Sequence, residues 1–91
     1  MAKKTTRNEN EKRDLERFAE KIAAWARYGK RWAARGDQEM VRFNARDVRA
    51  LQAIYDAIRR GDYRKAAGRA YRLDTIVRDQ IPVRLYNEIT R

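Results

Sequence analysis

The chain contains neither cysteine nor histidine. The absence of these two residue types excludes disulfides, zinc–thiolate sites, cysteine nucleophiles and the most common general base of enzymes. The remaining residues form no recognisable acid–base pair, nucleophile motif or metal-binding cluster. We therefore expect a protein that is not an enzyme and that holds no metal and no cofactor.

Long apolar runs are also missing from the sequence. The longest one, from Ile22 to Ala26, is far shorter than the roughly 20 residues that a membrane-spanning helix needs. The basic residues 1–7 are followed by the polar residues 8–11, and not by the apolar stretch of a signal peptide. We expect a protein without a membrane partner that resides in the cytoplasm, or in the host cytoplasm if it is viral.

Proline and glycine, which interrupt helices, are scarce: the sequence has one proline and four glycines among 91 residues. Alanine and arginine, which favour helices, occur fourteen and seventeen times. The length suits one small domain, since domains usually have roughly 100–150 residues. We therefore expect an all-α chain with a basic N-terminal tail over residues 1–8 and a single helical domain over residues 9–91.

The first expected helix runs from Glu9 to Ala34, because its apolar residues recur every three or four positions and form one stripe. The members of this stripe are Leu15, Phe18, Ile22, Trp25, Gly29 and Trp32. Gly36 suits the left-handed position after a helix, and Asp37 can accept the free amides of the next helix. These two residues predict a turn that folds the second helix back on the first.

The second stripe consists of Val41, Asn44, Val48, Leu51, Tyr55 and Ile58, and it ends at a second glycine–aspartate pair, Gly61 and Asp62. Asn44 is the polar exception in this stripe and has two interpretations. It is either a buried residue that sets the register of the helices, or, together with Asp47, a new N-cap that divides the helix.

The third stripe extends from Tyr63 to Ile81 and contains the small residues Ala66, Ala67, Gly68 and Ala70. Pro82 then suits the first turn of a short closing helix. The pattern as a whole predicts a small antiparallel three-helix bundle with a short fourth C-terminal helix.

Positive charge exceeds negative charge by ten, since Lys and Arg total 23 and Asp and Glu total 13. Acidic residues cluster near the N-terminus and are absent between Lys21 and Gly36. The cations recur at helical spacing and form basic stripes: Arg27, Lys30, Arg31 and Arg35 on the first helix, Arg42, Arg46 and Arg49 on the second, and Lys65, Arg69 and Arg72 on the third. Basic faces that are merely solvated do not account for this segregation of acids. The stripes therefore favour an anion-binding surface.

Aromatic residues accompany the basic stripes. Tyr28 lies off the apolar stripe of the first helix, and Tyr71 lies next to Arg72, so both are candidates for stacking on nucleobases. Trp25 and Trp32 lie on the apolar stripe, which favours packing in the core or a protein interface. Because the first helix is longer than its partners can cover, we expect self-association as a homodimer, or a docked protein, at these two residues.

Two functions remain compatible with these patterns. The leading hypothesis is a non-enzymatic protein that engages nucleic acid, or a nucleoprotein, through phosphates and thus with little sequence preference. The alternative is an inhibitor or adaptor whose basic face fills an acidic or nucleic-acid-binding groove of a host polymerase, nuclease or CRISPR effector. A short basic helical chain without motifs is similar in general type to the accessory proteins that bacteriophages encode against host machinery.

Overall fold

The computed structural model describes residues 9–91 of the chain and shows a bundle of helices. The predicted basic tail over residues 1–8 lies outside the described residues. The helices are α1 (Glu9–Ala34), α2 (Gln38–Arg59), α3 (Tyr63–Tyr71), α4 (Thr75–Arg78) and α5 (Val83–Ile89). Residues 9–91 contain no strand. The predicted all-α bundle is confirmed, and α1 begins and ends at the predicted residues.

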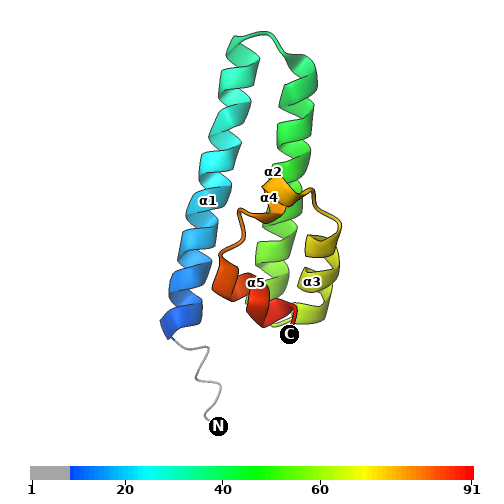
Figure 1. The fold of residues 1–91 in the computed structure, drawn as a ribbon. Helices are drawn as coiled ribbons and strands as arrows, with labels where there is room; N and C mark the ends of the chain where they lie inside the picture. The colour runs from blue at the N-terminus through cyan, green and yellow to red at the C-terminus, as the bar shows by residue number, and fades with distance from the viewer. Residues whose placement is uncertain (1–8) are drawn as a thin grey trace.

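The two longest helices form an antiparallel hairpin that determines the elongated shape of the molecule, 53 × 22 × 18 Å (Figure 1). Both glycine–aspartate turns have the predicted geometry. The glycine has a positive φ in each turn, 77° at Gly36 and 82° at Gly61. The side chain of the next residue, Asp37 or Asp62, accepts a hydrogen bond of 3.1 or 3.2 Å from the backbone N–H three residues further on. These caps reverse the chain twice.

The length predicted for the third helix is wrong, because the structure divides the segment 63–81 into α3 and α4. The helix ends at Tyr71, and Asp74 then adopts an extended backbone conformation with φ −62° and ψ 153°. The guanidinium of Arg78 donates a 2.8 Å hydrogen bond to the carbonyl oxygen of Leu73 and satisfies it after the helix has ended. The chain therefore turns here, although the apolar spacing continues. The short closing helix after Pro82 is confirmed as α5.

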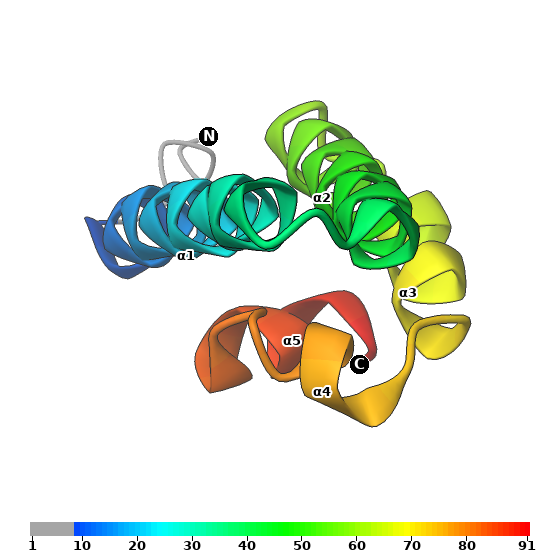
Figure 2. The same ribbon diagram turned by 90° about the horizontal axis from the view of Figure 1, so that it is seen from above.

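The hydrophobic core lies at one end of the hairpin, which we call the base. There α3 packs beside α2, and α4 and α5 lie together on one face of the hairpin (Figures 1 and 2). The buried apolar residues are Leu15, Phe18, Ile22, Leu51, Ile54, Ala57, Ile58, Ala66, Ala67, Ala70, Val77, Ile81, Leu85 and Ile89. Among residues 9–91, this core has no member between Ile22 and Leu51. The other end of the hairpin, Ala24 to Asp47, is called the tip; it consists of two helices alone.

Asn44 joins α1 and α2 within the tip. Its side-chain amide donates a 2.9 Å hydrogen bond to the backbone carbonyl oxygen of Trp25, and α2 continues without a break through this position. A Cβ atom at Gly29 would lie only 2.9 Å from the Asn44 side-chain oxygen, so glycine permits the close approach. The structure therefore supports the first interpretation of Asn44, a buried residue that fixes α1 and α2 relative to each other. The interpretation as an N-cap that divides the helix is wrong.

None of the helices between residues 9 and 91 is sufficiently long and apolar to cross a bilayer.

Candidate nucleic-acid interface

Charge is distributed unevenly along the hairpin. The acids Glu9, Glu11, Asp14, Glu16 and Glu20 occupy the base half of α1. Residues 21–49, which include the tip, carry eight cations against three carboxylates. Arg27, Lys30, Arg31 and Arg35 are all exposed, and in the described part of the chain none of them forms a salt bridge. The tip of the hairpin is therefore a solvated cationic surface whose charges are not neutralised within the fold.

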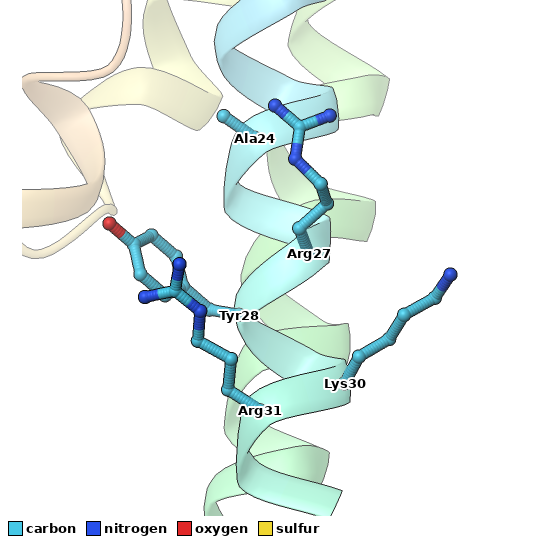
Figure 3. Close-up of a pocket in the computed structure, with 5 residues that line it drawn as sticks. All are labelled: Ala24, Arg27, Tyr28, Lys30 and Arg31. Carbon is cyan, nitrogen blue, oxygen red and sulfur yellow. The ribbon is translucent and has the colours of Figure 1, made fainter.

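An aromatic cleft of about 330 Å³ opens in the tip between α1 and α2. Its lining residues are Trp25, Tyr28, Trp32, Met40, Phe43, Asn44 and Asp47. The charge of Asp74, at the start of α4, acts on Asp47. Tyr28, which lines the cleft, extends to the side of α1 on which the C-terminal segments are drawn in Figure 3. Within residues 9–91, only α1 and α2 contribute residues to the lining of the cleft.

Three guanidinium groups lie over aromatic rings of this cleft. The guanidinium carbon of Arg31 is 5.3 Å from the ring centroid of Tyr28, and that of Arg35 is 5.4 Å from the ring of Trp32. On α2, Arg46 lies 5.1 Å from the ring of Phe43. Such cation–π contacts hold charged groups against apolar surface. The contacts make Arg31, Arg35 and Arg46 a cationic rim around the aromatic cleft.

The other cations of α1 point in different directions. Figure 3 shows Tyr28 and Arg31 extending to the same side of the helix, whereas Lys30 points to the opposite side and Arg27 lies along the helix. These four residues, with Ala24, line a shallow depression of about 370 Å³. The predicted stripe on α1 therefore surrounds much of the helix and is not confined to one flank.

The third stripe lies apart from the tip. Its residues Lys65 and Arg69 are on α3, and Arg72 directly follows that helix, which packs beside α2 at the base (Figure 1). Tyr71 is 58% exposed and borders a separate cavity between α3 and α5. Arg42, Arg46 and Arg49 are exposed on α2. The structure thus places the first stripe, Arg42 and Arg46 at the tip and Arg49 just outside it, and leaves Tyr71 and the third stripe elsewhere.

The two tryptophans differ in their surroundings. Trp25 is half-buried, packs against the edge of the core and meets Tyr28 edge-to-face, with 5.6 Å between the ring centroids. Trp32 is half-buried and lies further toward the end of the tip, in the lining of the aromatic cleft. Self-association through these residues stays a prediction. The packing of Trp25 shows that part of the apolar stripe of α1 is used within the fold.

Asp47 is the carboxylate in the lining of the cleft. Burial raises the pKa of its carboxyl above the usual 3.8. The charge of Arg46 and the indole N–H of Trp25 oppose the shift, and Asp74 adds to it. Within residues 9–91, the buried Trp25 Nε1 forms no well-aligned hydrogen bond. The charged form of Asp47 is therefore only partly compensated in the folded state.

The raised pKa of Asp47 predicts a pH-dependent stability. The native state binds this proton more tightly than the unfolded state, so the carboxylate stabilises the fold least when it is ionised, above its native pKa. We expect Asp47→Asn to increase the free energy of unfolding at pH 7, with the gain disappearing as the pH falls through the native pKa toward 3.8. Urea unfolding at several pH values measures this difference. Asp56→Asn, at an exposed position of α2, removes the same charge as a control, and an unchanged or lower stability of Asp47→Asn at pH 7 would contradict the account.

Phe43 and Met40 are site residues that the basic stripes and stacking candidates do not include. Phe43 is 42% exposed and lies beside the apolar stripe of α2. Only the register of the hairpin, fixed at Asn44, brings it opposite Trp32 in one cleft. The sequence signal that could have identified Phe43 is an aromatic residue that directly follows Arg42 and lies three residues before Arg46.

Comparison with known proteins returned no match to a family model, to a curated protein sequence or to a solved structure. No group of three or more acidic side chains that could hold a metal ion occurs within residues 9–91.

Proposed function

We propose that this chain is a small non-enzymatic nucleic-acid-binding protein that contacts the phosphate backbone with the arginines at the tip of its hairpin. The supporting observation is the group of exposed cations on α1 that form no salt bridge with carboxylates of the described chain. Phosphate suits a row of guanidinium groups, because each fork can donate two parallel hydrogen bonds to it. We expect this binding to take place in the cytoplasm.

The shape of the molecule suits this role. The cationic tip lies at one end of a molecule 53 Å long, and the core, with the salt bridge between buried Asp14 and exposed Arg84, lies at the other. The tip can therefore approach a large polyanion without steric obstruction from α3, α4 and α5. A concentrated positive potential also accelerates the encounter with an anionic partner.

A gel-shift assay with random duplex and single-stranded DNA and RNA tests the proposal. If four to six arginines neutralise phosphates, the logarithm of the affinity for duplex falls with the logarithm of the salt concentration at a slope of roughly −4 to −5. All random sequences bind with similar affinity, because phosphate contacts carry no base information.

An absence of binding even at about 50 mM salt, where counterion release is strongly favourable, overturns the proposal. In that case the cationic tip fits the alternative, an inhibitor or adaptor that fills an acidic groove of a host protein such as a polymerase, nuclease or CRISPR effector. Such a complex survives higher salt because apolar contacts accompany the charges.

A further inference from the structure

The aromatic cleft is a feature that phosphate binding leaves unexplained. Phosphate contacts need cations alone, yet the rim arginines Arg31, Arg35 and Arg46 lie around a concave surface built from four aromatic rings and a methionine. Tyr28 and Phe43 are 43% and 42% exposed in this surface. Exposed rings gathered in one cleft favour the binding of a flat apolar group.

We propose that the aromatic cleft receives an unpaired base of a single-stranded nucleic acid, while the rim arginines hold the phosphates on either side of it. This inference rests on the proposed function of the tip. A nucleotide combines the two properties that the site requires, a planar ring with a π-face and a directly attached anion. Aromatic stacking next to a positively charged track is the usual way in which proteins bind single strands without sequence preference.

The dimensions of the cleft agree with this occupant. Its volume of about 330 Å³ lies at the small end of ligand pockets, which measure roughly 300–1,000 Å³. This size suits one planar ring system. The hydrogen bond from Asn44 to the Trp25 carbonyl oxygen and the close approach at Gly29 fix the two walls relative to each other. The site is therefore formed before the ligand arrives, which lowers the entropic cost of binding.

Strand preference separates base binding from simple charge attraction. A duplex has the higher density of phosphates and attracts cations more strongly, with a salt slope of about −0.9 per contact against about −0.7 for a single strand. Its bases are stacked and paired, so that none of them can enter the aromatic cleft. A preference for single strands over duplex of equal length is therefore the result expected of contacts with bases.

Tryptophan fluorescence reports on the cleft directly, because the chain has two tryptophans and both line it. The probes are an oligothymidylate of about 12 nucleotides, the length that one small domain covers, a duplex of that length and a phosphodiester chain of that length without bases. We expect oligothymidylate to quench the fluorescence and to bind about tenfold more tightly than the chain without bases, which corresponds to one stacked base. The chain without bases should leave the fluorescence unchanged.

A pair of leucine variants tests the position of the contact. Phe43→Leu removes a ring from the cleft and should weaken oligothymidylate binding about tenfold. It should change the affinity for the chain without bases far less, because Arg46 keeps its charge after the ring beside it is lost. Tyr71→Leu removes an exposed ring on α3, outside the cleft, and should leave both affinities unchanged. Circular dichroism confirms that both variants keep their helix content.

The outcomes distinguish this inference from the proposed function. Equal affinities for oligothymidylate and for the chain without bases would overturn the base site and leave phosphate binding intact. Failure of every probe to bind at about 50 mM salt would overturn both. A dimer in sedimentation that Phe43→Leu dissociates, together with no quenching by oligothymidylate, would assign the cleft to a second copy of the chain and also overturn the inference.

Discussion

Exchange of Phe18 for alanine is expected to lower the free energy of unfolding by about 3–5 kcal/mol, the usual cost of removing a buried phenyl ring. Phe18 is fully buried and packs against Tyr55 on α2, with 5.9 Å between the ring centroids. It lies in the middle of the core at the base, where cavities cannot be filled from solvent. Since a small domain is stable by roughly 5–15 kcal/mol, the variant loses a large part of its stability.

The second phenylalanine of the chain provides the matched control. Phe43 is 42% exposed in the tip, and Phe43→Ala should change the free energy of unfolding by less than about 1 kcal/mol, as is usual for surface substitutions. Urea unfolding followed by circular dichroism measures both variants. Equal losses of unfolding free energy would show that Phe43 stabilises the fold as much as Phe18 does. That result would contradict the separation of a stabilising base from a binding tip.

Local chemistry made the hairpin predictable. Glycine followed by aspartate ends one helix and caps the next, and this pair occurs in the turn after α1 and in the turn after α2. The divided third helix was not predictable by the same rule, because no glycine precedes Asp74 and the apolar spacing continues past it. The break goes with two features that the apolar spacing does not show: the Arg78 guanidinium donates to the carbonyl oxygen of Leu73, five residues earlier, and Val77 is buried in the core.

The candidate site was predictable in its charges but not in its shape. The acid-free segment between Lys21 and Gly36 indicates where the cations lie without knowledge of the fold. The aromatic cleft joins residues from two helices, and the position of Phe43 depends on the register of those helices. That register depends on Asn44 and Gly29, whose pairing is a three-dimensional property.

Removal of charge at the tip should weaken nucleic-acid binding about 100-fold near 0.15 M salt, because three phosphate contacts are lost together. The tip variant carries Arg31→Gln, Arg35→Gln and Arg46→Gln. Glutamine preserves helix propensity and much of the side-chain length, so the fold should be maintained. The matched base variant carries Arg59→Gln, Arg60→Gln and Arg64→Gln. These three arginines are also exposed and lie at the turn between α2 and α3, so both variants lose the same net charge.

The salt dependence of duplex binding by these two variants is the most direct test of the claim that the tip is the phosphate-binding surface. The account predicts that the tip variant reduces the slope from roughly −4 to −5 to about −2, whereas the base variant keeps the slope of the unmodified protein. Equal reductions in slope and affinity for the two variants would contradict it, because binding would then depend on net charge and not on the tip.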